Sequence, residues 1–367
     1  NQRKGVIPGL LERWYAERKE MQAKKKESTT DDDKAFWDKR QLVKKINLNS
    51  LYGAILNAGC RFFDQRIGQS TTLTGRSIAK HMDAYVNECI TGKYDHVGDT
   101  IIYGDTDSIY FSSYPVMSKL PDFANFGWQK EQVSQLYDQI ADITNNSFPS
   151  FMKQSFNVPE TRGGVIRAGR ELCATRGLFI TKKRYAVLIY DKEGKRKDVD
   201  GKPGEIKAMG LDLKRADTPK VVQQFLSSIL SDVLQGQGQD HVVGRIREFK
   251  QEFQSRPAWE KGTPKRVNNL THYGSQEFAK GRTSMPGHVR AALNWNTLKR
   301  IHSDRYSIEI VDGMKVIVCK LKANPMNYTS VAYPIDELRL PDWFKELPFD
   351  QSLMEETIVD QQISNLL

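Results

Sequence analysis

Apolar residues recur at helical spacing in two highly charged stretches at the start of the chain. Leucines, aromatic residues and a methionine repeat through residues 9–27, and Pro8 lies just before them, where a helix tolerates proline. Residues 27–33 are polar and rich in residue types that begin helices, and the apolar pattern resumes over 34–56. Two long helices joined by a short polar loop predict an antiparallel helical hairpin.

The rest of the chain alternates between helical and strand-like patterns. Helical periodicity predicts helices at 68–90, 129–154, 218–236 and 240–254. Short runs of β-branched and aromatic residues predict strands at 100–103, 108–111, 178–190, 204–211, 307–319 and 330–335. No internal repeat or low-complexity tract is evident. The chain thus combines predicted helices and strands, and we expect an α+β fold.

Composition indicates a folded, basic protein. The 367 residues are 39% apolar and 27% charged, which is typical of a folded chain, and about 150 residues per domain predicts two or three domains. The 55 lysines and arginines outnumber the 45 aspartates and glutamates, so the formal net charge is +10. A positive balance favours a polyanionic partner, either nucleic acid or an anionic membrane.

Cysteine spacing and hydropathy exclude other classes of protein. The four cysteines form no Cys-x-x-Cys pair and no histidine cluster accompanies them, so we expect neither a zinc site nor a disulfide framework. No apolar run is long enough to span a membrane, and the basic, polar start lacks the pattern of a signal peptide. We therefore expect a cytoplasmic protein with no membrane partner.

The sharpest chemical motif is Tyr103-Gly-Asp105-Thr-Asp107-Ser108. Carboxylates two residues apart in a strand or tight hairpin point the same way, and their repulsion favours a cation beside them; oxygen ligands suit Mg²⁺. An ordinary aspartate-rich turn is the alternative, whereas an EF-hand is excluded because its glycine and closing glutamate are missing. The flanking apolar strands favour the metal site, because they predict a buried hairpin with both carboxylates at its tip.

The second helix of the helical hairpin carries a polar face. Lys45, Asn49 and Tyr52 are spaced so that a cation, an amide and an aromatic ring lie on one side. Such a set can hold a triphosphate and contact a base, and Gly53 leaves room for close approach. On the preceding helix, Arg18 facing the lysine would complete a phosphate clamp. The alternatives are a solvated face with a buried tyrosine, and an arginine on the surface.

A third motif, Thr181-Lys-Lys183-Arg-Tyr185, lies inside an otherwise apolar predicted strand. The lysine and the tyrosine would then share one strand face, which suits a DNA backbone or minor groove. The alternative is a charged edge strand that prevents aggregation. Upstream, Glu171 next to Arg170 either adds a third carboxylate near the aspartates or forms a surface ion pair.

In this order, the motifs resemble those of family B DNA polymerases, most closely the replicative enzymes of tailed bacteriophages. The matching stretches are motif B at 45–53, motif C at 103–108, the acidic palm strand at 170–171, the Lys-x-Tyr motif at 183–185 and the start of the thumb at 218–220. The resemblance implies the right-hand architecture of polymerases. Its parts would be helical-hairpin fingers at 1–57, an antiparallel β palm with helices at 58–213, and a mainly helical thumb with the C-terminal tail at 214–367.

The resemblance also implies a DNA-directed DNA polymerase, which joins the nucleotide of a dNTP to a primer 3′-hydroxyl with two Mg²⁺ ions. The catalytic metal ligands would be Asp107 and Asp105, with Glu171 as an additional carboxylate. The incoming nucleotide would be bound by Arg18, Lys45, Asn49 and Tyr52. The primer–template DNA would be held by Lys183, Arg184, Tyr185 and Gly53.

Two departures from the family pattern matter. The basic residue expected one turn after the fingers arginine is Gln22, so the triphosphate clamp is expected to be weaker unless a neighbouring lysine compensates. Motif A, Asp-x-x-Ser-Leu-Tyr-Pro, is absent. Its Ser-Leu-Tyr core recurs at 50–52, but Asn47 and Gly53 stand at the aspartate and proline positions. The acidic exonuclease motifs are missing too.

These absences predict a partner: an N-terminal polypeptide that holds motif A and the exonuclease domain. The alternative is that this sequence is a fragment of one longer chain. A rival from another class is a non-catalytic, polymerase-like subunit that grips DNA. The apolar end at 363–367 loosely matches a peptide that binds a sliding clamp. The alternative is an end that is frayed or docked against the core. A phage enzyme implies the cytoplasm of a bacterial host cell.

Overall fold

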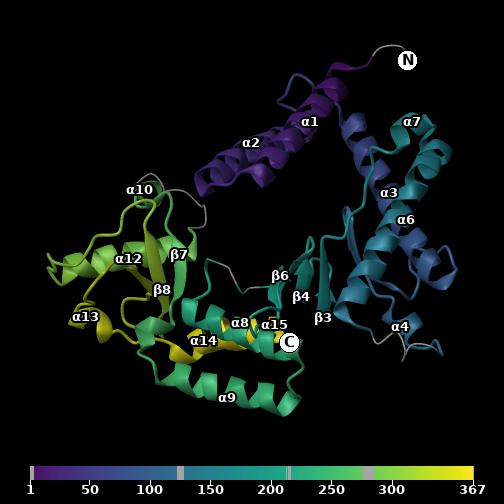
Figure 1. Ribbon diagram of the computed structural model, residues 1–367. Coiled ribbons are helices and arrows are strands. Elements are labelled where there is room, and N and C mark those ends of the chain that lie inside the picture. The colour runs from purple at the N-terminus through teal and green to yellow at the C-terminus, as the bar shows by residue number, and fades with distance from the viewer. Residues whose placement is uncertain (1–3, 122–127, 212, 214–215, 276–284, 367) are drawn as a thin grey trace. The chain divides into compact units, whose positions relative to one another are not determined.

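The computed structural model describes residues 4–121, 128–211, 213, 216–275 and 285–366 (Figure 1). The chain divides into two compact units, Asn1–Gly169 and Arg170–Leu367. Both contain helices and antiparallel strands, so the predicted α+β class is confirmed. None of the helices in the described ranges combines the length and apolar character that crossing a membrane requires.

The first unit opens with the predicted helical hairpin. Helix α1 spans Val6–Glu27 and helix α2 spans Asp31–Ile55. Polar contacts join them, including a hydrogen bond from Lys25 to Asp38 at 2.6 Å and an ion pair between Lys44 and Glu17. Because α1 has no buried residue, the hairpin depends on these contacts and on half-buried side chains rather than on a closed core.

The start of α2 is set by a helix cap. The Thr30 hydroxyl accepts a hydrogen bond from the Asp33 amide at 3.1 Å, and three aspartates occupy the first turn, where the helix dipole favours negative charge. We expect Thr30→Ala to destabilise α2 by about 1 kcal/mol, because the amide loses its acceptor. Hydrogen exchange of the first-turn amides measures this. Thr29→Ala, at an exposed neighbour, is the control and should leave exchange unchanged.

The remainder of the first unit surrounds a small β-hairpin. Its elements are α3 Gln65–Thr91, β1 Ile101–Asp105, β2 Ser108–Phe111, α4 Tyr114–Met117, α6 Lys130–Phe156 and α7 Glu160–Gly163. Strands β1 and β2 form a two-stranded antiparallel sheet that contacts α3, and α6 packs against α3. Buried His81 joins these helices: its ring hydrogen-bonds Tyr94 at 2.8 Å and Ser147 at 2.9 Å. Burial lowers the pKa of His81.

The second unit opens with a larger antiparallel sheet. Its strands are β3 Leu172–Thr181, β4 Arg184–Lys192, β5 Lys195–Arg196 and β6 Glu205–Met209. Strand β4 pairs with the other three and is almost wholly buried, as its continuous apolar run requires. Helix α8 (Lys220–Gln235) contacts β3 and β4, and α9 (Gln239–Ser255) follows it, with Phe225 stacked on Phe249 at 3.8 Å.

The second unit also contains a second sheet. Three antiparallel strands form it, β7 Thr263–Arg266, β8 Lys315–Lys320 and β9 Ser330–Pro334. The remaining helical elements of this unit are η2 Ala258–Lys261, α10 Leu270–Tyr273, α12 Gly287–Ile301, α13 Asp342–Lys345, α14 Gln351–Glu355, the π-helical turn η3 Glu356–Asp360 and α15 Gln361–Leu366. Trp295 of α12 is fully buried, and its indole N–H donates to the Ile308 carbonyl at 2.9 Å.

Two predicted strands were wrong in extent. The run 178–190 is not one strand, because Lys183 adopts a left-handed conformation with φ 62° and the chain reverses between β3 and β4. The run 307–319 contributes only Lys315–Lys320, since the preceding residues, which include a turn at Gly313 with φ 83°, bond to α12 and to loops instead of a strand. Apolar composition alone did not reveal either break.

Candidate active site

Asp105 and Asp107 lie at the tip of the β1–β2 hairpin. Asp105 is the last residue of β1 and Asp107 lies in the turn, while Thr106 between them has a φ of 56°. The Asp107 amide donates to the Asp105 carbonyl at 2.7 Å, and the Thr106 hydroxyl donates to an Asp105 carboxylate oxygen at 3.1 Å. The predicted tip position is confirmed. The alternation of side chains along a strand does not explain this position, because Asp107 lies in the turn and not in a strand.

The tip is more exposed than the sequence suggested. Asp107 is exposed, Asp105 is half-buried, and the neighbouring Ile102 is 50% exposed. Within the described ranges, neither carboxylate forms an ion pair, and no group of three or more His, Cys, Asp or Glu side chains is placed to hold a metal ion. Two carboxylates that have no ion-pair partner among the described residues are a donor set that suits a divalent cation.

A carboxylate that the sequence did not mark, Asp83 of α3, lies behind the hairpin. A Cβ built on Gly104 would be 3.9 Å from an Asp83 carboxylate oxygen, while the other oxygen is buried without a hydrogen-bond partner. Burial raises the pKa of Asp83 to about 6, and the charge of His96 opposes the rise. Periodicity could not identify this residue, because its environment depends on how α3 packs against β1.

The burial of Asp83 predicts a pH-dependent cost to stability. The pKa of this carboxyl in the folded chain, about 6, lies above its ordinary value of 3.8, so stability is highest while the carboxyl is protonated and falls as the pH rises through 6. We expect Asp83→Asn to stabilise the chain by about 1–2 kcal/mol at neutral pH, allowing for the partly exposed side chain. Urea unfolding at pH 4.5 and pH 7.5 should show a larger gain at the higher pH. An equal gain at both would contradict the assignment.

The predicted nucleotide-binding residues of α2 lie on a continuous helix. Lys45 and Asn49 are exposed, and the space beside Gly53 is open, with nothing within 4 Å of a Cβ placed there. Tyr52 is half-buried, and its hydroxyl lies 3.4 Å from the Gly68 carbonyl at the start of α3. Lys45 and Asn49 are thus accessible to a ligand, whereas Tyr52 is partly packed against α3.

The predicted placement of Arg18 opposite Lys45 across the hairpin stays a prediction. The Arg18 guanidinium donates to Gln41 at 3.2 Å, one turn before the lysine. The cation of α2 that reaches α1 is Lys44, which pairs with Glu17 and lowers the pKa of that carboxyl. Lys45 lies one turn after Gln41, on the same side of α2, and is exposed. Any contact of Arg18 with a triphosphate would therefore share this guanidinium with Gln41.

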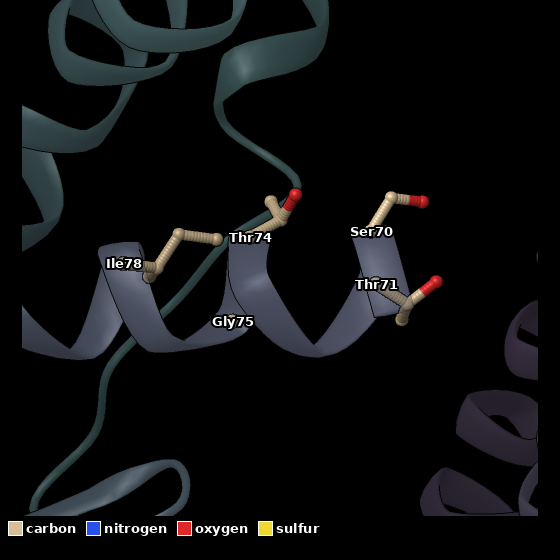
Figure 2. Close-up of a pocket in the computed structure, with 5 residues that line it drawn as sticks. All are labelled: Ser70, Thr71, Thr74, Gly75 and Ile78. Atoms are coloured by element: carbon tan, nitrogen blue, oxygen red, sulfur yellow. The ribbon is translucent and has the colours of Figure 1, made fainter. Parts of the chain in front are cut away.

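A shallow hollow follows the N-terminal half of α3. Figure 2 shows the residues that line it, Ser70, Thr71, Thr74, Gly75 and Ile78. Hydroxyl, methyl and glycine surfaces make up this lining, which contains no titratable side chain. The hollow therefore offers no acid, base or metal ligand, and it does not include any residue that the motifs predicted.

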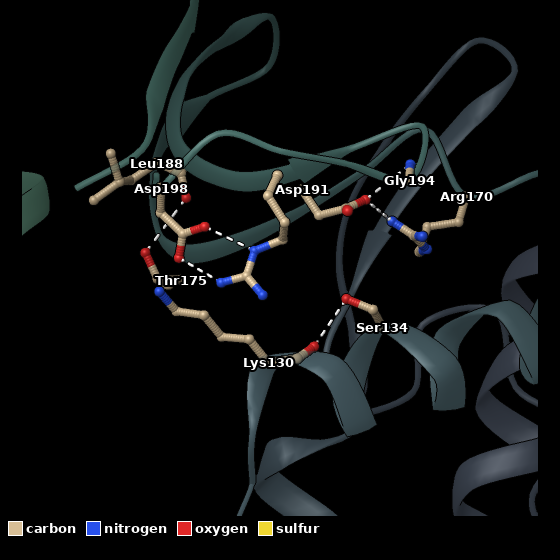
Figure 3. A network of polar contacts seen from close by, with 9 residues as sticks. Lys130, Ser134, Arg170, Thr175, Leu188, Asp191, Gly194 and Asp198 are labelled. Carbon is tan, nitrogen blue, oxygen red and sulfur yellow. Dashed lines mark hydrogen bonds and ion pairs between the residues drawn. The ribbon is translucent and has the colours of Figure 1, made fainter. Parts of the chain in front are cut away.

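In the second unit, the predicted palm carboxylate has a nearby cation. Glu171 is exposed and pairs with Lys207 of β6 at 3.0 Å, rather than with Arg170 as in the predicted surface ion pair. Its neighbour Arg170 donates instead to buried Asp191, which also accepts the Gly194 amide at 3.1 Å (Figure 3). These contacts hold the start of β3 to the end of β4.

The three residues of the Lys-x-Tyr motif have different surroundings. Lys183 lies in the turn and is exposed, so it does not share a strand face with Tyr185 as predicted. Tyr185 is 7% exposed and stacks on Phe179 at 5.6 Å. Arg184 donates to the carbonyl of Asn365 near the C-terminus. Lys183 is therefore exposed on the turn, whereas Tyr185 is buried in the sheet.

Comparison with known proteins supplies the family. The model of DNA polymerase family B matches residues 1–143, which include α1, α2 and both hairpin aspartates. The chain belongs to DNA polymerase family B. The resemblance inferred from the ordered motifs is thus confirmed.

Phage polymerases are among the relatives of this family B chain. The DNA-directed DNA polymerase of Enterobacteria phage T4 is 30% identical over 315 residues, and that of Escherichia phage RB69 is 27% identical over 304 residues. Each match covers 80% of this chain and 33% of the relative, so the chain spans about a third of their length. The DNA polymerase delta catalytic subunit of Candida albicans is 28% identical over 237 residues, covering 64% of this chain and 20% of that protein.

Proposed function

We propose that this family B chain takes part in template-directed DNA synthesis, in which the nucleotide of a dNTP is joined to a primer 3′-hydroxyl. One observation carries the proposal: Asp105 and Asp107 lie together at a hairpin tip, inside the region that the family model matches. Polymerase relatives from phages and from a yeast support the same activity.

Two Mg²⁺ ions would be held at this tip, with Asp107 as the principal ligand and Asp105 as the supporting one. The ions would supply activation of the primer hydroxyl and neutralisation of the triphosphate and the leaving pyrophosphate. The carboxylates' own task is to hold this charge at a fixed point. The hydrogen bonds within the turn support that task, because they restrict the tip before any ligand arrives. Glu171 is proposed as an additional carboxylate.

The incoming nucleotide would bind the exposed side of α2. Lys45 and Asn49 are accessible there for contact with the triphosphate, and Tyr52 would contact the nascent base pair beside Gly53. Arg18 would add a second positive charge. In this proposal α1 and α2 are the fingers, the elements from α3 to β6 are the palm, and the elements from α8 onward are the thumb with the C-terminal tail.

A further carboxylate segment would come from outside this sequence. Both metal ions need ligands from two palm segments in the proposed mechanism, and this chain lacks the aspartate of motif A. The β1–β2 sheet supports the idea of an added segment, because it has only two strands and leaves Ile102 half exposed. We propose that the segment belongs to an N-terminal polypeptide that also holds the exonuclease domain.

Primer extension tests the proposal. The chain is combined with the polypeptide that carries motif A, a labelled primer–template and Mg²⁺, and each dNTP is supplied singly. We expect extension only by the nucleotide complementary to the first template base, with loss of extension when EDTA removes the metal. Extension that ignores the template, or persists in EDTA, would contradict template-directed two-metal synthesis.

A further inference from the structure

The turn between β3 and β4 is tied to the C-terminus of the chain. Arg184 is the first residue of β4, directly after Lys182 and Lys183 of the turn. Its guanidinium donates a hydrogen bond to the backbone carbonyl of Asn365, 181 residues away. A side chain expected to touch DNA therefore has a partner inside the protein.

The C-terminal helical segment is anchored where it meets this arginine. Leu366 is 4% exposed and belongs to the core of the second unit, as do Ile358 and Val359. Helix α15 packs against α8, which in turn contacts β3 and β4 (Figure 1). Asp360 also pairs with Lys250 of α9 at 2.6 Å. The segment is thus a docked element, so the Asn365 carbonyl is held at a defined place.

The turn also packs against Gly210, the residue that follows β6. Gly210 has a φ of 64°, and a Cβ built there would lie 2.0 Å from the Lys183 carbonyl oxygen. Only glycine allows this approach, because any side chain would collide with backbone. With Tyr185 buried beneath, the turn is restrained by β6 on one side and through Arg184 by the C-terminal segment on another.

We infer that Arg184 is a positioning residue, which ties the Lys182–Lys183 turn to the docked C-terminal helix so that the turn meets primer–template DNA in one geometry. The inference rests on the proposed function, since it concerns how this motif holds DNA. Leu366 is the anchor of the arrangement. The last residues of the chain then act in DNA binding itself, rather than only as a peptide for a sliding clamp.

Fluorescence anisotropy with a labelled primer–template, using the full chain at one fixed salt concentration, measures the effect. We expect Arg184→Ala, and deletion of residues 365–367, each to weaken binding about tenfold, the loss expected when a charged hydrogen bond is removed. The double variant should lose no more than either single variant, because both break the same tie. Asn365→Ala is the matched control: it keeps the backbone carbonyl and should bind normally.

Additive losses would overturn the inference, because they would mean that Arg184 contacts DNA directly. Normal binding after the deletion, with clamp-dependent extension lost, would also overturn it and assign the tail to a clamp. Hydrogen exchange of the turn amides in free protein is a second measurement. The deletion should speed their exchange while the centre of β4 stays protected. If the chain binds no primer–template at all, the proposed function fails, and this exchange result still decides whether the tail holds the turn.

Discussion

Replacing Asp107 with asparagine is expected to lower the rate of primer extension by the assembled polymerase on the order of 10³-fold, the scale on which removal of one charge-stabilising group acts. Asparagine keeps the size of the side chain but removes the negative charge, so the turn should still form while cation affinity falls. Asp105→Asn is expected to cost less, since Asp105 already accepts a hydrogen bond from Thr106 and is proposed as the supporting ligand.

Single-turnover extension at saturating dNTP measures the loss, and a Mg²⁺ titration separates weak metal binding from slow chemistry. Asp99→Asn is the matched control, because this exposed aspartate lies just before β1 and outside the proposed site. Activity that survives Asp107→Asn unchanged would refute the metal assignment. It would favour instead the rival in which the chain is a non-catalytic subunit that grips DNA.

The second large effect concerns the chain by itself. Residues 1–367 alone are expected to extend no primer detectably, because the site provides carboxylates from one palm segment where two-metal transfer needs two. Adding a separately purified polypeptide that contains Asp-x-x-Ser-Leu-Tyr-Pro should restore extension. The association should bury a large, mainly apolar surface, since Ile102 and other apolar side chains of the first unit are exposed.

Mutation of the motif A aspartate in the added polypeptide is the control for this experiment. It should leave the two chains associated, as measured by size-exclusion chromatography, but inactive in extension. Full activity from the chain alone would contradict the requirement for a second carboxylate segment. Association without activity, when both motifs are intact, would contradict the proposed division of the metal site.

Much of the local structure followed from the sequence because its causes are local. The polar loop before Asp31 predicted the break between α1 and α2, and the Thr30 cap realises it. Apolar strands around Gly-Asp-Thr-Asp predicted the β1–β2 hairpin with its carboxylates at the tip. Gly236 predicted the end of α8, where it adopts φ 82°. Caps, turns and periodicity act over a few residues, so the order of residues is sufficient to predict them.

The partners of the candidate site residues were not predictable in the same way. The bond from Arg18 to Gln41 was not predicted, because the rotation of one helix against the other decides which side chains meet. Lys183 was expected in a strand and lies in a turn, where Gly210, the residue after β6, packs against it. Both outcomes depend on contacts between elements, which periodicity within one element does not encode.

The sequence by itself determined the family, the ordered motifs and the two carboxylates of the proposed metal site, because these depend on residue identity and short spacing. Only the tertiary structure decided that Asp83 is buried behind Gly104 with a raised pKa, and that Arg184 is held by the Asn365 carbonyl. The physical reason is common to both. Desolvation of a charge and capture of a distant hydrogen-bond acceptor arise when segments pack together, and the residues involved are remote along the chain.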